Sequence, residues 1–429
     1  MKLRASRTLG LVLLLFVAAC APLRRPESAP LWAGPPPAVP SAQFTPAPPL
    51  QFLVDPYPEE CGPSWLGADV ASSIRLGQDR YAWLFGDTLL GSVRDDCPGG
   101  EEYCDRRVEP EPERAMIRNS VGISARASDG AFRRVVKYWP TSGGEPRDMF
   151  PSDDGTFLWP LAGARVGPYL YVTANRNTPE SGLAPVGNVL LRIDNPDDSP
   201  EEWSIRRWDL PHFRAYDGPL PNLVWTTAIV PAGKYVYLLG QLGEATGSST
   251  VLARFPVTEM AAATWPPKAD YLLTDERTGR RRFGAFDLER LHRVGGLPGT
   301  SEATVDWDPD VGWYSYRIPP LEFDVRLYTA GDLRGPWRDE GAVYRLPAPW
   351  STAQRSDCPP EQAPCPRYIA YAVKAHPELA PKGARVLSYN VNIASGSFAE
   401  AEAAAEESPG FYVPQLLIGP AKKPLSQRP

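Results

Sequence analysis

The sequence predicts an all-β protein, specifically a five-bladed β-propeller, preceded by an export signal and a proline-rich tether. Short apolar runs rich in Val, Ile, Tyr, Trp and Leu recur along the chain. Each run is bounded by turn-forming Gly, Pro, Asp or Asn, and the runs fall into about five groups of similar length. Helical periodicity is almost absent. We therefore expect antiparallel meanders, the units from which propeller blades are built.

Residues 1–20 have the features of a lipoprotein signal peptide. A basic start leads into the apolar run Leu11 to Val17 and then into small residues before Cys20. The apolar part is about ten residues long, against roughly twenty for a membrane-spanning helix, so we expect no lasting transmembrane anchor. The segment Val17-Ala18-Ala19-Cys20 resembles a lipobox, in which the cysteine thiol carries a diacylglyceryl group. The alternative is an ordinary signal peptide that happens to contain a cysteine.

Lipidation of Cys20 predicts an exported protein that is held to the cell envelope by its lipid. The next residue is Ala21 rather than an acidic residue, which fits transport to the outer membrane if the host has one. Residues 21–50 contain ten prolines and little apolar bulk, which is typical of a semi-rigid tether.

Residues 51–420 are expected to form one β-propeller domain, because no second proline-rich boundary divides them. The groups of apolar runs lie near 65–140, 155–210, 222–275, 298–347 and 366–395. A β-sandwich is the alternative, but two packed sheets would hardly hold so many strands. The clearest strand candidates are Tyr81–Phe85, Val121–Ala125, Tyr169–Thr173, Val189–Ile193, Leu223–Val230, Tyr235–Leu239, Val251–Phe255, Trp313–Tyr316, Val325–Tyr328 and Val386–Val391.

The charge balance excludes some partners. A net charge of −6 and a pI near 5.4 give no general attraction to nucleic acid. We expect a monomer without a cofactor. No phosphate loop, dinucleotide fingerprint or Ser-His-Asp order is evident.

Five cysteines remain beside Cys20, and an exported compartment allows them to oxidise. Cys97 and Cys104 could close one short loop, and Cys358 and Cys365 another. Pairing of Cys61 with Cys97 or Cys104 is the alternative. The spacing is not that of a zinc site, and the chain has only three histidines, so we expect no metal.

The most informative segment holds two aspartates, Asp69 in Gly-Ala-Asp-Val and Asp87 in Leu-Phe-Gly-Asp-Thr. If the chain reverses at Gly77 to Arg80, the two become cross-strand neighbours, although a simple count leaves them one residue out of register. Two close carboxylates raise one pKa, as required for an acid and a base in one site. Gly67 and Gly86 would leave room beside them. The structural alternative is that each aspartate caps a turn.

These motifs resemble those of a bacterial family of five-bladed propellers long catalogued as a domain of unknown function, some members of which are endo-D-arabinanases. The resemblance also rests on Asn119-Ser120-Val121, on Ala375-His376-Pro377-Glu378-Leu379 and on Ser388-Tyr389-Asn390-Val391-Asn392. It implies glycoside hydrolysis by Asp69 and Asp87. One departure concerns the substrate: Tyr412-Val413-Pro414-Gln415-Leu416 stands where the family tends to have Tyr-Arg-Pro-Arg-Phe.

Four further residues are candidates for binding a sugar. Glu302 begins the fourth group of strands and could be a third carboxyl of the site, or a solvated charge at a strand end. His376 could bind a sugar hydroxyl, or make a structural hydrogen bond between blades. Trp65 and Trp159 lie beside proline or glycine near expected strand ends and could stack on sugar rings, although most tryptophans of a propeller pack in its core.

The sequence thus favours a surface-tethered glycoside hydrolase that acts on a furanose-containing or related polysaccharide, with Asp69 as base or nucleophile and Asp87 as acid. The competing hypothesis is a non-catalytic surface propeller that binds a glycan or a protein. In that case the two aspartates need not share an open pocket.

Overall fold

The computed structural model describes residues 44–46, 64–77, 79–91, 115–125, 137–139, 146–152, 155–181, 184–215, 221–245, 247–262, 266–320, 322–353, 367–380, 383–394 and 411–421. All six cysteines, and therefore the predicted lipidation and both predicted loop disulfides, lie outside these ranges. The signal segment and most of the predicted tether lie outside them as well.

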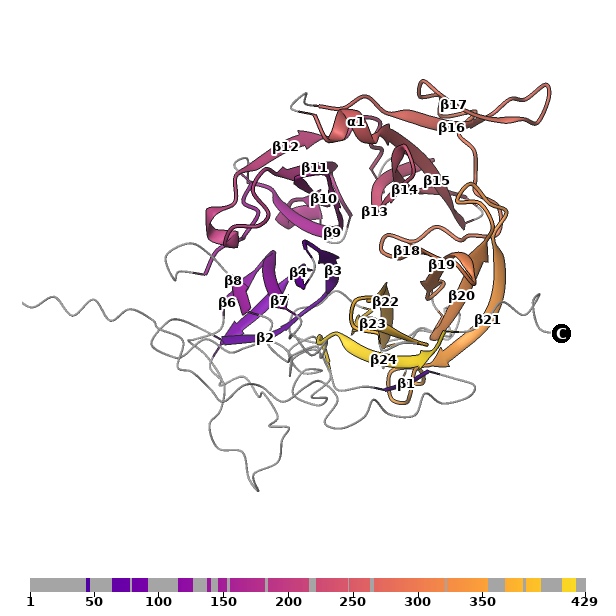
Figure 1. Cartoon of the computed structure of the whole chain (residues 1–429). Helices are drawn as coiled ribbons and strands as arrows, with labels where there is room; N and C mark the ends of the chain where they lie inside the picture. The colour runs from indigo at the N-terminus through magenta and orange to yellow at the C-terminus, as the bar shows by residue number, and fades with distance from the viewer. Residues whose placement is uncertain are drawn as a thin grey trace, which may run out of the picture.

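Five antiparallel sheets stand around a central axis, so the predicted five-bladed propeller is confirmed (Figure 1). Each blade begins with an inner strand and continues outward in chain order, except that the last blade takes its outer strand from the N-terminal side. Blade 1 is β3(Ser72–Arg75), β4(Arg80–Phe85), β7(Ser120–Ala125) and β8(Lys137–Trp139). Blade 2 is β9(Phe157–Val166), β10(Tyr169–Asn177), β11(Gly187–Ile193) and β12(Ile205–Asp209).

The remaining blades follow the same plan. Blade 3 is β13(Asn222–Ala232), β14(Tyr235–Glu244), β15(Gly247–Pro256), β16(Asp270–Thr274) and β17(Arg281–Gly284), with the one-turn helix α1(Val257–Met260) after β15. Blade 4 is β18(Thr304–Asp308), β19(Gly312–Arg317), β20(Asp324–Ala330) and β21(Arg338–Arg345). Blade 5 is β22(Tyr368–Ala375), β23(Ala384–Ile393), β24(Gln415–Pro420) and β1(Thr45–Pro46). Two short 3₁₀ turns, Pro179–Ser181 and Pro200–Glu202, complete the assigned elements.

The ring closes where the N-terminal side of the chain meets its C-terminal side. β1 pairs with β24 as Thr45↔Ile418 and Pro46↔Leu417. Phe44 is 3 % exposed and its ring packs against Gly419, where a side chain would leave it no room. Residues 44–46 lie within the predicted tether but belong to blade 5, because their backbone completes its outer edge.

Blade 1 carries an extension, the small sheet β2(Ser64–Ala68), β5(Thr88–Gly91) and β6(Ala115–Ile117). These strands run directly into or out of β3, β4 and β7. The pairs Ala68↔Thr88 and Ser72↔Leu84 share one register. The two sheets are therefore one long hairpin with a third strand, interrupted across its middle.

Each seam between neighbouring blades holds one hydrophobic cluster of the described residues. Blades 5 and 1 enclose Trp65, Trp83 and Phe85, whereas blades 2 and 3 enclose Leu223 and Trp225. The other three seams are filled in the same way. Successive side chains of a strand point to opposite faces of the sheet. Each blade can therefore supply apolar side chains to the seams on both of its sides.

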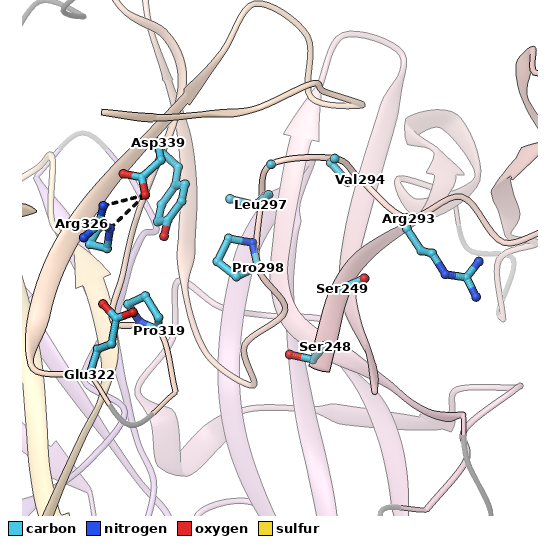
Figure 2. Close-up of a pocket in the computed structure, with 13 residues that line it drawn as sticks. Ser248, Ser249, Arg293, Val294, Leu297, Pro298, Pro319, Glu322, Arg326 and Asp339 are labelled. Atoms are coloured by element: carbon cyan, nitrogen blue, oxygen red, sulfur yellow. Dashed lines mark hydrogen bonds and ion pairs between the residues drawn. The ribbon is translucent and has the colours of Figure 1, made fainter. Parts of the chain in front are cut away.

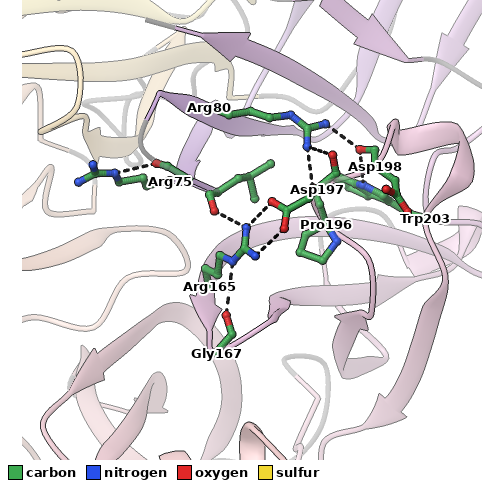
Figure 3. A network of polar contacts seen from close by, with 10 residues as sticks. Arg75, Arg80, Arg165, Gly167, Pro196, Asp197, Asp198 and Trp203 are labelled. Atoms are coloured by element: carbon green, nitrogen blue, oxygen red, sulfur yellow. Dashed lines mark hydrogen bonds and ion pairs between the residues drawn. The ribbon is translucent and has the colours of Figure 1, made fainter.

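A polar network also fastens blade 1 to blade 2 (Figure 3). Arg165 of β9 donates from Nη1 and Nη2 to the two carboxylate oxygens of Asp197, at 2.6 and 2.7 Å, and also to the carbonyl of Leu76. Arg80 of β4 donates to the carbonyls of Pro196, at 3.1 Å, and Asp197. The loop between β11 and β12 is thereby tied to the β3–β4 turn.

The ten predicted strands all lie within strands of the structure. The predicted limits of blades 1, 2 and 4 agree with the sheets. Blade 3 extends beyond residue 275 to include β17, and blade 5 extends beyond residue 395 to include β24 and also takes β1 from the N-terminal side. Inner strands β3, β9 and β18 escaped prediction as separate strands, because each mixes small, polar and apolar side chains. No described helix is long and apolar enough to span a membrane.

Candidate active site

Asp69, Asp87 and Arg118 lie at the interruption in the long hairpin of blade 1. Asp69 separates β2 from β3, Asp87 separates β4 from β5, and Arg118 separates β6 from β7. Ala68 pairs with Thr88 on one side of the break, and Ser72 pairs with Leu84 on the other. Because both pairs belong to the same register, Asp69 lies level with Asp87. The expected offset of one residue is therefore absent, and the two carboxylates oppose each other across the break.

The backbone at this break is strained. Val70 and Ala71, directly after Asp69, have φ of 66° and 47°, a region that residues with a Cβ rarely adopt. The turn is closed by a hydrogen bond from the Ala71 amide to the Asp69 carbonyl at 2.8 Å. Ala372 and Tyr412, with φ of 53° and 57°, flank the same site. Strain of this kind persists only where the surrounding structure enforces it, and such residues cluster at functional sites.

Asp69 is held by two tyrosines from blade 5. The hydroxyl of Tyr371, on β22, donates to Oδ2 of Asp69 at 2.9 Å. Tyr412, just before β24, also hydrogen-bonds this carboxyl. Burial, followed by the charges of Glu302 and Asp87, holds the pKa of Asp69 well above its usual range, and the two tyrosine hydrogen bonds oppose the shift. Asp69 is thus a positioned carboxyl that retains its proton unusually well.

Asp87 has different hydrogen-bond partners, one from blade 1 and one from blade 2. Trp159 of β9 donates its Nε1–H to Oδ1 at 2.8 Å, and Nη1 of Arg118 lies 3.5 Å from Oδ2. Burial raises the pKa of Asp87, whereas Trp159 and Arg118 lower it. Its side chain keeps 17 % exposure, so solvent or a ligand can reach it.

Glu302 supplies a third carboxyl from the start of blade 4, two residues before β18. Its Oε2 lies 3.6 Å from Nζ of Lys374, a buried lysine of β22 that donates to the carbonyl of Leu161 at 2.7 Å. Burial raises the pKa of Glu302 and Lys374 lowers it. Because the charge of Glu302 also raises the pKa of Asp69, the two carboxyls share one site.

Side chains from blades 1, 2, 4 and 5 therefore meet at one cluster near the axis, around Asp69, Asp87 and Glu302. Three carboxyls with raised pKa values stand beside two cations, two tyrosine hydroxyls and an indole N–H. Carboxyls placed in this way can exchange a proton with a bound ligand at higher pH than isolated carboxyls can. Among the described residues, no group of His, Cys, Asp and Glu has the arrangement of a metal site.

Trp65 and His376, two of the expected sugar-binding residues, lie elsewhere. Trp65 is fully buried and packs against Phe85, with 5.5 Å between ring centroids, so it has no free face for a sugar. This corrects the assignment of Trp65 as a sugar-binding residue. Trp65 lies on β2, and its side chain belongs to the core. Trp159 does reach the site, through its hydrogen bond to Asp87.

His376 is completely buried in the seam between blades 5 and 1. Its Nδ1 lies 2.7 Å from the hydroxyl of Ser73 on β3, and its Nε2 lies 2.8 Å from that of Ser388 on β23. The ring also stacks on Trp83 at 5.1 Å. With both ring nitrogens occupied, His376 makes the structural contact between blades that was the alternative to sugar binding.

The shared motifs hold the site in place. Thr88 donates to the carbonyl of Gly86 at 2.9 Å and contacts the Ser120 hydroxyl at 2.8 Å, which joins the two sides of the break. Asn390 donates to the carbonyl of Ala68 at 3.1 Å, directly before Asp69. Asn392 hydrogen-bonds Tyr371. These residues hold Asp69 and its neighbours in position.

Sequence reasoning missed Tyr371, Lys374 and Arg118 as site residues. Tyr371 and Lys374 are followed by the recognised Ala-His-Pro-Glu-Leu block, but nothing local marks them. Tyr412 was noted only for the residues that follow it. All four are brought to Asp69 or Asp87 by ring closure or by the hairpin break, neither of which has a local sequence signal.

The fold and the site together define a five-bladed propeller with a carboxyl cluster near its axis. Residues 57–266 match the family model of a domain of unknown function (DUF5005), which covers the hairpin with Asp69 and Asp87, blade 2 and much of blade 3. None of the curated proteins compared with the chain has significant sequence similarity to it.

Solved structures are similar to this chain over most of its length. A candidate hydrolase from Bacteroides ovatus ATCC 8483 has 15 % identity and a TM-score of 0.57, over 82 % of this chain and 86 % of that one. An α-L-arabinofuranosidase from Podospora anserina, in complex with cellotriose, has 10 % identity and a TM-score of 0.42, over 89 % and 98 %. A family 117 glycoside hydrolase from Zobellia galactanivorans has 11 % identity and a TM-score of 0.40, over 85 % and 87 %.

Proposed function

We propose that this chain is a glycoside hydrolase, tethered to the cell envelope through Cys20, that cleaves a furanose-containing polysaccharide in the manner of an endo-arabinanase. The observation that carries the proposal is the opposition of Asp69 and Asp87 across a strained hairpin break, with Glu302 facing the same space. Glycoside hydrolysis requires two carboxyls that differ in protonation: one protonates the leaving oxygen, and the other activates water or attacks the sugar.

The surroundings of the three carboxyls support this chemistry. Burial and mutual repulsion raise the pKa of Asp69, so the cluster keeps a proton for the leaving group at higher pH than isolated carboxyls would. Lys374 and Arg118 offset part of the negative charge. Tyr371 fixes the orientation of the Asp69 carboxyl.

We assign the base or nucleophile role to Asp69 and the acid role to Asp87, the order expected from the sequence. The contacts of Asp87 with Arg118 and Trp159 favour its ionised form and so oppose this order. Azide rescue decides between the orders. Azide restores activity to a variant that lacks the base or nucleophile and gives a glycosyl azide of inverted anomeric configuration. We therefore expect that product from Asp69→Gly and not from Asp87→Gly.

The competing function is a non-catalytic propeller that binds a glycan or a protein at the same face. In such a protein the aspartates need not converge and can be turned apart or buried. The mutual influence of Asp69 and Asp87 and the partial exposure of Asp87 favour catalysis instead.

The test is a polysaccharide panel that includes D-arabinan, L-arabinan and arabinoxylan, read both by binding and by the appearance of new reducing ends. We expect new reducing ends from at least one furanose-containing polymer. Binding without new reducing ends across the panel would support the non-catalytic alternative.

A further inference from the structure

A cavity lies at the seam between blades 3 and 4. Its volume is about 620 Å³, within the range of small-molecule sites. Figure 2 shows Ser248 and Ser249 on one side, Leu297 and Pro298 on the loop between the blades, and Arg326 with Asp339 on the other side. None of these residues belongs to the carboxyl cluster.

The cavity lies at the same end of blade 4 as Glu302. Thr304 pairs with Tyr316, so Arg317 stands level with Ala303, the residue after Glu302. Arg317 in turn pairs with Arg326, which lines the cavity. Pro298, also in the lining, precedes Glu302 by four residues, which at full extension span at most about 14 Å. The cavity and Glu302 are therefore close enough for a short oligosaccharide to span the distance between them.

The loop that links the two places is held firmly by neighbouring strands. Thr250 and Arg317 both donate to the Pro298 carbonyl, the former at 3.0 Å. Ser248 donates to the Gly299 carbonyl at 3.0 Å, and Thr227 to that of Thr300 at 2.6 Å. The wall of the cavity that leads to Glu302 is thus preformed, so a ligand would lose little free energy in ordering it.

The charges of the lining indicate a neutral polar ligand. Nε of Arg326 lies 2.9 Å from Asp339, and Nε of Arg293 lies 3.0 Å from Glu244. These guanidinium groups are already balanced by carboxylates, so they attract no further anion, but they retain N–H donors. Together with exposed Glu322 and the serine hydroxyls, they offer both donors and acceptors, the combination that sugar hydroxyls require.

We propose that this cavity is a distal subsite of the same enzyme. It binds an uncharged sugar unit of the polymer while Asp69 and Asp87 cleave a glycosidic bond elsewhere in that polymer. The inference rests on the proposed function and deepens it. The enzyme would bind one part of the polysaccharide between blades 3 and 4 and cleave another part near the propeller axis. Chain length, rather than the terminal sugar alone, would then determine affinity.

Gly295 allows a direct test, because it lines the cavity and a Cβ on it would meet open space. In Gly295→Phe the ring would occupy part of the cavity. Gly331→Phe is the matched control, since Gly331 also faces open space but lies outside the lining. Binding is measured by calorimetry in the Asp69→Asn background, so that no probe is cleaved. The probes are disaccharides and hexasaccharides of D-arabinan, L-arabinan and xylan, with oligogalacturonate as the anionic comparator.

We expect Gly295→Phe to weaken binding of a neutral hexasaccharide by about tenfold or more, the loss of one or two hydrogen bonds to charged groups. The disaccharide should be unaffected, and Gly331→Phe should change neither. Equal effects on both lengths, no effect on the hexasaccharide, no neutral hexasaccharide that binds, or binding of oligogalacturonate alone would each overturn the inference. If the unmodified protein cleaves nothing but Gly295→Phe still weakens hexasaccharide binding, the proposed hydrolysis fails and the subsite stands.

Discussion

Single residues near Asp69 have roles that their types alone do not reveal. Gly67 and Gly86 were expected to leave room for a ligand beside the carboxyls. Instead, a Cβ on Gly67 would meet the Tyr412 carbonyl at 2.8 Å, and one on Gly86 would meet Oδ1 of Asp69 itself. The space that these glycines provide is therefore filled by the protein, and it is what allows the Asp69 carboxyl to sit in the break.

Gly86→Ala should consequently impair catalysis without adding or removing a functional group. The new methyl group would displace the Asp69 carboxyl and press on Val70 at 3.0 Å. A displacement of about 1 Å can cost about 100-fold in rate, so we expect a loss of that order in kcat/KM. Gly77→Ala is the control, since a Cβ there meets nothing within 4 Å. Equal activity of the two variants would contradict this role of Gly86.

The protonation of Asp69 should also be visible in stability. Since its folded pKa lies well above the ordinary value of 3.8, the folded protein binds this proton more tightly than the unfolded chain does. The free energy of unfolding should then fall as pH rises from about 4 towards the raised pKa. Asp69→Asn removes this penalty, so the variant should be more stable than the parent at pH 7, with a smaller difference at pH 4. Thermal denaturation at both pH values checks this, and a variant that is less stable at pH 7 would contradict it.

At the scale of elements, the sequence predicted strands more readily than their arrangement. Runs such as Tyr81–Phe85 are marked by consecutive buried side chains on a strand with two packed faces. The two-residue strand β1 has no such pattern, and its place beside β24 depends on a partner more than 370 residues away. Contacts of that kind arise from closure of the whole ring and cannot be read from neighbouring residues.

The same closure should make Phe44 important for stability. Its ring is 3 % exposed, lies against Gly419 and contacts Tyr316 with 5.6 Å between ring centroids. We expect Phe44→Ala to lower the free energy of unfolding by about 3 kcal/mol. Trp307→Ala, at a site with 54 % exposure, should change it by at most about 0.5 kcal/mol. Similar denaturation midpoints for both variants would show that the closure contributes little.

At the scale of the whole molecule, the sequence predicted the five blades and the two aspartates but not the assembled site. Asp69 and Asp87 lie on one hairpin, so their opposition follows from local register. Tyr371, Tyr412 and Glu302 approach them from blades that are distant in sequence, and only the closed ring brings them together. His376 and Trp65 have residue types that are suited to sugar binding, but both pack between blades instead. Residue type alone therefore does not identify a site residue.

The proposed anchor is independent of the ring. A proline-rich segment separates Cys20 from Phe44, the first described residue. We therefore expect no packing contact of the propeller to depend on Cys20. Cys20→Ser should therefore move the protein from the detergent phase to the aqueous phase, or leave an uncleaved precursor, while its melting temperature stays unchanged. Equal membrane retention of the parent and the variant would place the anchor elsewhere.

The central claim is that Asp69 and Asp87 break a glycosidic bond. It is tested most directly by the rate at which Asp69→Asn and Asp87→Asn release reducing ends from the polymer that the parent protein cleaves, with Asp79→Asn, exposed at the turn of the same hairpin, as the control. We predict that each of the first two variants loses about 100-fold or more in kcat while remaining folded, and that Asp79→Asn keeps the parental rate. Undiminished hydrolysis in both Asp69→Asn and Asp87→Asn would contradict the claim.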